Sequence, residues 1–215
     1  RRLEGQGGNV VPGRQQVPWQ IGSPVFDAAA MLDMVGSTAF TRIFAVTDDG
    51  PRVAHVPVLV CEGPALRFHL ANNNALTKAL DGQVALALTE GPNAYVSANW
   101  YVDVRGAVPT WNYTAVECEG PVRRLDRAAL IDLVDTLSAR MEPKVGENWT
   151  RAKMEPARFE AMLGAITAFE LRIDDLRGTR KLSQNKSGDE VAGVLNGMEA
   201  NGAQPMADAI RAARA

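Results

Sequence analysis

The first 120 residues contain a succession of short β-forming segments, most of them separated by tight-turn signals. Six segments have the composition of strands, at 38–46, 52–60, 65–70, 83–89, 93–101 and 108–119. Gly with Asp, Glu or Pro marks the turns near residues 50, 63, 82 and 91. Short turns join antiparallel strands, whereas parallel strands need a longer crossover. The pattern therefore predicts an antiparallel barrel or closed sheet, in a chain that is mainly β with some α.

Alternation along these segments predicts which side chains share a face. In segment 65–70, Arg67 and His69 lie on the face opposite Leu66, Phe68 and Leu70.

Two further residue types constrain the sheet. Pro57 cannot donate a ladder hydrogen bond, so its segment is expected at an edge or at a bulge. Ala85 and Ala87 form a face of small side chains, which indicates that something packs closely against them.

After Asp126 the hydrophobic period becomes helical. The pattern predicts a helix over 127–141 with Asp126 as its N-cap, and a second from Pro156 to about 163. A late strand is expected at 165–173, then a polar stretch at 177–187, a helix around 191–198 and a short one from Pro205. We therefore expect a flexible extension at 1–22, a barrel domain at 23–187 with a helical insertion at about 126–164, and C-terminal helices at 188–215.

Composition excludes several classes of protein. Lys and Arg total 23 and Asp and Glu total 25, giving a net charge of -2 at pH 7, so no overall positive field attracts nucleic acid. No apolar run approaches the roughly 18 residues that span a bilayer, and no secretory signal is recognisable. We expect a cytoplasmic protein that does not enter a membrane.

The chain also lacks the signatures of common enzyme folds. It has no GxGxxG after a strand, no GxxxxGK[ST], no HExxH, no GxSxG and no CxxC. With only His55, His69, Cys61 and Cys118, and no metal-ligand spacing among them, we expect no metal site and two reduced core thiols. No catalytic residue can be assigned.

Aromatic and amide side chains are concentrated between 91 and 113. This stretch holds five of the thirteen aromatic residues, namely Tyr95, Trp100, Tyr101, Trp111 and Tyr113. Alternation separates Trp111 from Thr110 and Asn112, so one strand face is apolar and the other carries hydrogen-bonding groups. The aromatics either pack in the core or form the walls of a pocket for a planar heteroaromatic ligand.

Two places could hold an anion. The first is the end of segment 65–70, where His69 shares a face with Arg67 and three asparagines follow. The second is 181–186, which is either a solvated charged loop or a source of lysines for a phosphate.

Several motifs together resemble one family, the PaiB-type FMN-binding split-barrel proteins, which are described as negative transcriptional regulators. The matching segments are GPNAYVS at 91–97, NWY at 99–101, VPTWNY at 108–113 and KLSQN at 181–185, with weaker agreement at 53–57 and 68–71. The family commonly has His at the position of Asn93, and Pro after the position of Asn74. The resemblance implies a split β-barrel with peripheral helices that forms a homodimer with FMN at its interface.

The resemblance also implies roles for twelve residues. The phosphate would be held by His69, Asn74 and Lys78, and the ring or ribityl chain would contact Tyr95, Ser97 and Trp100. The site would be completed by Thr110, Trp111 and Asn112, with Lys181, Ser183 and Gln184 supplied in one arrangement by the partner subunit.

Two functions are compatible with such a pocket. The first is a flavin-responsive negative transcriptional regulator, and the alternative is a flavin-dependent oxidoreductase. Direct DNA binding is expected to be weak, because no helix-turn-helix pattern carries a basic recognition helix. The best basic cluster spans 172–186 and contains Asp174 and Asp175.

Overall fold

The computed structural model describes residues 26–214, so the predicted extension at 1–22 lies outside the described residues. The strands are β1 (Phe40–Thr47), β2 (Gly50–Pro57), β3 (Leu59–Cys61), β4 (Ala65–Ala71), β5 (Val84–Val96), β6 (Thr110–Arg124), β7 (Ile166–Arg172) and β8 (Asp175–Lys181). The helices are α1 (Ala28–Thr38), α2 (Arg127–Met141), α3 (Pro156–Leu163), α4 (Gly188–Ala200) and α5 (Gln204–Ala212). Short 3-10 helices are η2 (Ala75–Lys78), η3 (Ala98–Trp100), η4 (Val104–Gly106), η5 (Glu142–Val145) and η6 (Arg151–Lys153).

The sheet has the strand order β2-β1-β5-β6-β7-β4-β3, with β8 also paired to β6, and all of these pairs are antiparallel. This confirms the predicted split barrel with peripheral helices. Among the described residues the sheet is not closed by hydrogen bonds. Its two end strands, β2 and β3, pair only with β1 and β4 and not with each other. Pro57 lies on an edge strand, as predicted.

Strand β6 changes partners along its length. Its lower part, Tyr113–Glu119, pairs with β8, and its last residues from Val122 pair with β7. Gly120 lies at the change, where an added Cβ would be 1.8 Å from the carbonyl oxygen of Arg172. Only glycine permits this close backbone approach.

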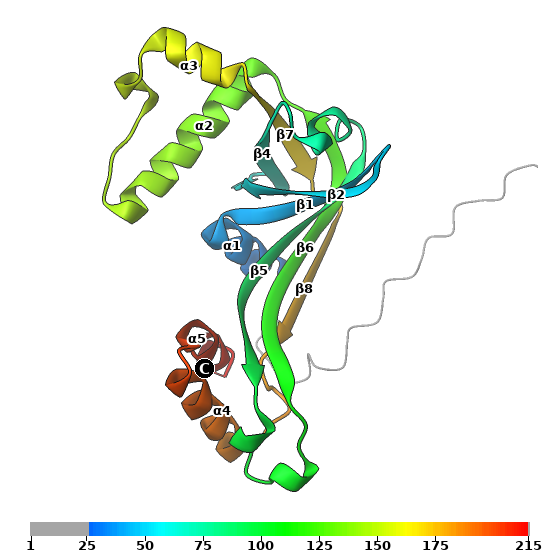
Figure 1. Cartoon of the computed structure of the whole chain (residues 1–215), viewed down its shortest axis with the longest axis vertical. Helices are drawn as coiled ribbons and strands as arrows, with labels where there is room; N and C mark the ends of the chain where they lie inside the picture. The colour runs from blue at the N-terminus through cyan, green and yellow to red at the C-terminus, as the bar shows by residue number, and fades with distance from the viewer. Residues whose placement is uncertain (1–25, 215) are drawn as a thin grey trace, which may run out of the picture.

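The molecule is elongated, with the barrel and α2–α3 at one end and α4–α5 at the other (Figure 1). The long β5–β6 hairpin and β8 run between the two ends (Figure 1). The barrel core includes Ile43, Phe68 and Phe169, and a separate apolar cluster joins α4 and α5 to the lower end of the hairpin. A third cluster, which includes Leu133, packs α2 and α3 against β3 and β7.

The bounds of α2 and α3 agree with the sequence prediction because their signals are local. Asp126 accepts a hydrogen bond from the N–H of Ala129 at 2.8 Å, and Pro156 occupies the first turn of α3. Among residues 26–214, none of the helices is long and apolar enough to span a membrane.

The structure differs from the predicted elements in four places. Segment 52–60 is divided between β2, which ends at Pro57, and β3, which begins at Leu59. Segments 83–89 and 93–101 are one strand, β5, with an irregular register between Glu90 and Asn93, and residues 98–100 form η3. A Cβ on Gly91 would be 2.2 Å from Thr114 Oγ1, so the bulge brings the two strands close together. Residues 175–181 form strand β8 within the region predicted as a polar stretch, and α1 was not predicted.

The small side chains of β5 face the barrel core of the same chain. Ala85 and Ala87 are buried there beside Cys118. Close packing against this face is thus confirmed, and it is the core of the same chain that packs there. Burial raises the pKa of Cys118 to about 12, and both cysteines are free thiols, as predicted.

Candidate functional site

A cavity of about 410 Å³ lies at the lower end of β6, against the segment that follows β8. We call it the β6–β8 cavity. It is lined by Tyr101, residues 106–108, Thr110, Asn112, Lys181 and residues 183–186. The structure therefore brings five of the twelve predicted site residues together within one chain, namely Thr110, Asn112, Lys181, Ser183 and Gln184.

Asn112 is the most buried polar residue of the cavity, with 1% of its surface exposed. Its Nδ2 donates a hydrogen bond to Ser183 Oγ at 2.9 Å, while its Oδ1 is buried without a partner. Ser183 itself has a φ of 58°, an uncommon backbone conformation for a residue with a side chain. Asn112, which lines the cavity, thus carries a desolvated acceptor that a ligand N–H or O–H would satisfy.

Two lysines make the cavity basic. Lys181 Nζ donates to Thr110 Oγ1 at 2.5 Å. Lys186 Nζ lies 4.1 Å from the ring centroid of Tyr101 and 3.2 Å from a carboxylate oxygen of Glu190. Tyr101 and Lys186 are not among the twelve site residues that the family resemblance implies, although both lie in or next to the quoted motifs.

Local hydrogen bonds shape the segment after β8. Gln184 Oε1 accepts from the N–H of Leu182 at 2.8 Å, and its Nε2 donates to the carbonyl of Arg180 at 2.7 Å. Arg214 Nη2 donates to the carbonyls of Ser183 and Lys186, at 3.0 Å each. The amide of Gln184 is therefore used to hold the turn that presents Ser183.

On β6 the face that carries Trp111 is exposed, and the face that carries Asn112 is buried. This is the reverse of the arrangement in which the aromatic residues pack in the core. Trp111 is 50% exposed, so it does not pack in the core, whereas Asn112 is buried. Trp111 forms an edge contact with Tyr95, at 6.0 Å between ring centroids, and its Nε1 donates to Asn93 Oδ1 at 3.1 Å. Tyr95 and Trp111 are opposite each other on the exposed sheet face and do not line the cavity.

Ser97 and Trp100 make contacts within the chain that hold η3 in place. Ser97 Oγ accepts from the N–H of Asn99 and caps η3. The indole of Trp100 packs against α4, where a Cβ on Gly197 would be 2.3 Å from Trp100 Cδ2. Asn74 Oδ1 likewise caps η2 by accepting from the N–H of Leu76 at 2.9 Å, and Lys78 is exposed at the end of η2.

His69 lines a different cavity of about 470 Å³, between the outer face of β4 and the helices α2 and α3. None of the other predicted site residues lines it, and neither does any Lys or Arg. Its Nδ1 is buried without a hydrogen-bond partner, and burial lowers the pKa of the imidazole. The cavity therefore contains no Lys or Arg that could bind a phosphate together with His69.

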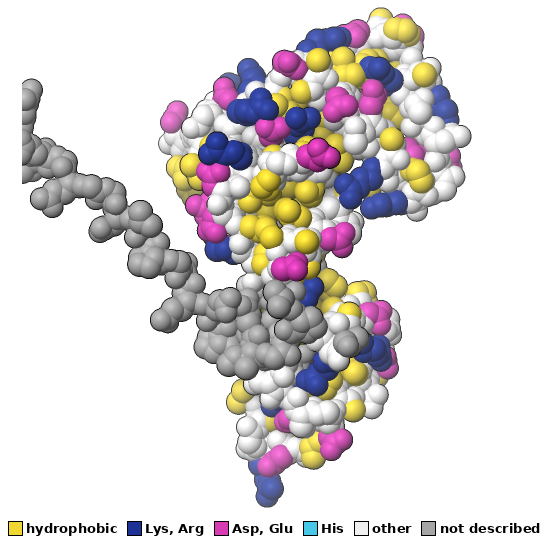
Figure 2. Space-filling view, turned by 180° about the vertical axis from the view of Figure 1, so that it is seen from behind, with side chains coloured by type: hydrophobic (Ala, Val, Ile, Leu, Met, Phe, Trp, Pro, Cys, Tyr) yellow, Lys and Arg dark blue, Asp and Glu magenta, His cyan; other side chains and the backbone are white. Residues whose placement is uncertain are grey.

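Two arginines of the basic cluster at 172–186 are paired with carboxylates. Arg172 pairs with Asp174 at 2.7 Å. Arg177 contacts Asp175, and its guanidinium lies 2.9 Å from both Glu117 and Glu119. Basic and acidic side chains are also interspersed over the face shown in Figure 2.

Residues 24–175 match the model of a family described as "Putative FMN-binding domain". The protease synthase and sporulation protein PAI 2 of Bacillus subtilis is 25% identical over 179 residues, which cover 81% of this chain and 86% of that protein. An uncharacterized protein of Aspergillus fumigatus is 30% identical over 160 residues, which cover 65% of this chain and 61% of that protein.

Two solved structures share the fold. The FAD and heme binding protein from Mycobacterium smegmatis superposes with a TM-score of 0.53 at 15% identity, covering 78% of each chain. The flavocytochrome Anf3 from Azotobacter vinelandii superposes with a TM-score of 0.54 at 16% identity, covering 78% of this chain and 74% of that one.

Proposed function

Because the chain belongs to the PaiB-type family of FMN-binding split-barrel proteins, we propose that it holds FMN in the β6–β8 cavity and acts as a flavin-responsive negative regulator of transcription. The observation that carries the FMN site is the buried, unpartnered Oδ1 of Asn112. The name of the Bacillus relative, which links that protein to protease synthesis and sporulation, favours a regulatory role.

The residues of the cavity fit the parts of FMN. Lys181 and Lys186 are the cations that a phosphate needs. Asn112 Oδ1 can accept from a ribityl hydroxyl or from the ring N–H, and the buried ring of Tyr101 offers an apolar wall. When bound, FMN supplies redox chemistry, while these side chains bind and orient it.

A titration of flavin fluorescence tests this site. We expect one FMN per chain, and we expect Asn112→Ala to weaken binding by about 1 to 3 kcal/mol because a ligand donor loses its acceptor. Asn201→Ala is the matched control, since Asn201 caps the end of α4 by donating to the carbonyl of Gly197. Unchanged affinity in Asn112→Ala, or a wild-type protein that retains no FMN after gel filtration, would contradict the proposal.

A flavin-dependent oxidoreductase is the second candidate. It is favoured by the neutralised arginines around Arg177, which leave little basic surface for DNA, and by the flavocytochrome among the structures of the same fold. Anaerobic addition of NADH or NADPH to the FMN-loaded protein separates the two functions. Rapid bleaching of the flavin favours the oxidoreductase, and a flavin that stays oxidised favours the regulator.

We also propose a homodimer. The exposed face of the sheet carries several aromatic side chains on adjacent strands: Phe40, Phe44, Tyr95, Trp111 and Tyr113. The register places Phe44 opposite Leu86, and Tyr95 opposite Trp111, so these side chains share one face. Exposed apolar surface of this kind is typical of protein interfaces.

A further inference from the structure

The cavity that contains His69 has the composition of a ligand pocket. We call it the His69 cavity. It is lined by Pro57 and His69 from the sheet, by Val134, Leu137, Ser138 and Met141 from α2, by Glu142, Trp149 and Met154 from the segment after α2, and by Phe159, Met162, Leu163 and Ile166. Its volume of about 470 Å³ lies within the range of about 300 to 1,000 Å³ that is usual for small-molecule sites.

The apolar lining favours an aromatic occupant. Three methionines, Met141, Met154 and Met162, meet Trp149 and Phe159 around this cavity. Thioether sulfur makes favourable contacts with aromatic rings, and its flexible side chain adapts to their shape. Rings also pack well against other rings in edge or offset contacts.

The polar groups of the cavity are few, and two of them already have partners. Ser138 Oγ donates to the carbonyl of Val134 at 2.9 Å, and Glu142 Oε2 accepts from the N–H of Trp149 at 2.9 Å. His69 Nδ1, in contrast, is buried without a partner. Leaving such a group unpaired costs free energy that a ligand would recover by hydrogen bonding to it.

We propose that the His69 cavity is a second binding site, separate from the β6–β8 cavity, for a small aromatic molecule with one hydroxyl or similar group that hydrogen-bonds to His69. A hydroxyl suits this position because it can donate to an imidazole lone pair or accept from an imidazole N–H. A phosphate or carboxylate ligand does not suit it, since no Lys or Arg lines the cavity and Glu142 does.

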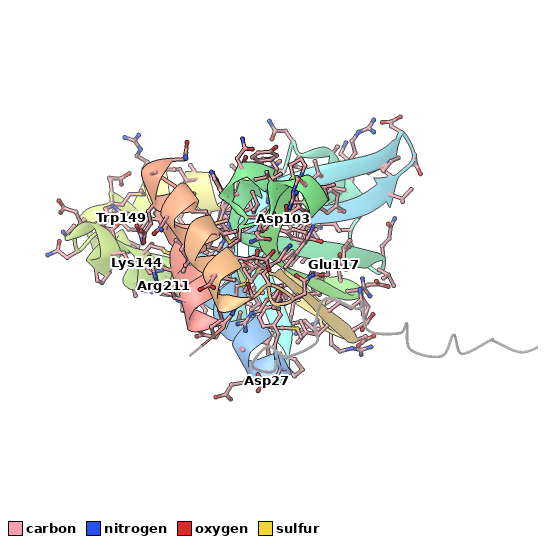
Figure 3. All side chains as sticks on the ribbon, turned by 90° about the horizontal axis from the view of Figure 1, so that it is seen from below. Asp27, Asp103, Glu117, Lys144, Trp149 and Arg211 are labelled. Atoms are coloured by element: carbon pink, nitrogen blue, oxygen red, sulfur yellow. The ribbon has the colours of Figure 1, made fainter. Side chains whose placement is uncertain are left out.

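The His69 cavity lies apart from the β6–β8 cavity. In Figure 3, Trp149 lies beside α2 and α3, away from Glu117 of β6. No residue lines both cavities. Occupation of one is therefore expected to leave the other accessible.

Fluorescence titration of the full chain with 2-naphthol, in the presence of saturating FMN, tests the proposal. We expect saturable binding that FMN does not displace. Naphthalene has the same shape without the hydroxyl. We expect His69→Phe to weaken 2-naphthol binding about tenfold, and to leave naphthalene binding unchanged, because only the hydroxyl loses its partner.

A second pair of variants localises the ligand. Met162 lines the cavity and is exposed. Met162→Trp should therefore fill part of the cavity and weaken the binding of both compounds about tenfold. Ala161→Trp adds the same side chain to an exposed neighbour on α3 that does not line the cavity, and should change neither affinity.

Several results would overturn the proposal. The first two are the absence of saturable 2-naphthol binding and displacement of 2-naphthol by FMN. The others are an equal effect of Met162→Trp and Ala161→Trp on affinity, or an equal loss of affinity for both compounds in His69→Phe. If His69→Phe does not fold by circular dichroism, His69→Leu replaces it with the same expected outcome. If neither variant folds, the comparison of Met162→Trp with Ala161→Trp tests the proposal by itself.

Discussion

Protonation of His69 opposes folding, because burial lowers the pKa of its imidazole below the ordinary value of 6.5. Between the folded pKa and 6.5, the unfolded chain binds more protons than the folded chain. The free energy of unfolding should therefore decrease as the pH falls through 6.5 toward the folded pKa, and this contribution is absent above 6.5.

Urea unfolding of wild type and His69→Phe across this pH range measures the effect. We expect the variant to lose part of the decrease at low pH. His55→Phe is the control, since it makes the same substitution at a histidine that is exposed on β2. Identical pH dependence in wild type and His69→Phe would contradict the assignment.

Strand alternation correctly grouped residues on β6, but it did not show which group faces inward. Apolar content favoured burial of Trp111, yet Asn112 is the buried residue. The partner of Asn112 is Ser183, 71 positions away in sequence. A hydrogen bond of this separation has no local signal, so the site's central contact could not be predicted from the sequence.

Helix α4 packs so closely on η3 that it requires glycine. A Cβ on Gly193 would be 2.1 Å from the carbonyl oxygen of Trp100. Alanine normally stabilises a helix interior by up to about 1 kcal/mol relative to glycine. Here we expect Gly193→Ala to destabilise the protein by about 1 to 3 kcal/mol, because a backbone group must move.

Thermal melts of Gly193→Ala and Gly188→Ala provide the comparison. Gly188 begins the same helix, and nothing lies within 4 Å of an added Cβ there. This control should melt at or slightly above the wild-type temperature. Equal melting temperatures for the two variants would show that α4 can shift away from Trp100.

Helices α2 and α3 were predicted from local signals, whereas strand β8, which is defined by long-range pairing, was not predicted. The N-cap Asp126 and the first-turn Pro156 located α2 and α3. In contrast, the Arg- and Thr-containing sequence of β8 does not look like a strand. It becomes one because it pairs with β6, where Arg177 meets Glu117 and Glu119 across the sheet.

At the scale of the whole molecule, light scattering tests the proposed dimer. We expect wild type to be a dimer and Trp111→Asp to be a monomer, because the charge would lie on the aromatic sheet face. Val145→Asp is the control, since Val145 is also apolar and exposed but lies in η5, away from that face. A monomeric wild type would exclude the interface.

Charge over the whole molecule predicts weak, nonspecific DNA binding. With Arg172 and Arg177 already paired, contact with about three phosphates would give a log K against log salt slope near -3. Gel shifts with genomic fragments at physiological salt measure this. Nanomolar, promoter-specific binding would contradict it and would support direct regulation.

The shared pairing of β6 has a consequence for biosynthesis. While the ribosome adds α2 and α3, β5 and β6 are already made, but β7 and β8 are not. The edge of β6 that will receive them is unpaired during this interval, and unpaired edges recruit other strands. The helical insertion forms from local contacts and can be complete first. Since Lys181 and Ser183 follow β7 in the chain, the β6–β8 cavity can be assembled only after the β5–β6 hairpin and the helical insertion have been made.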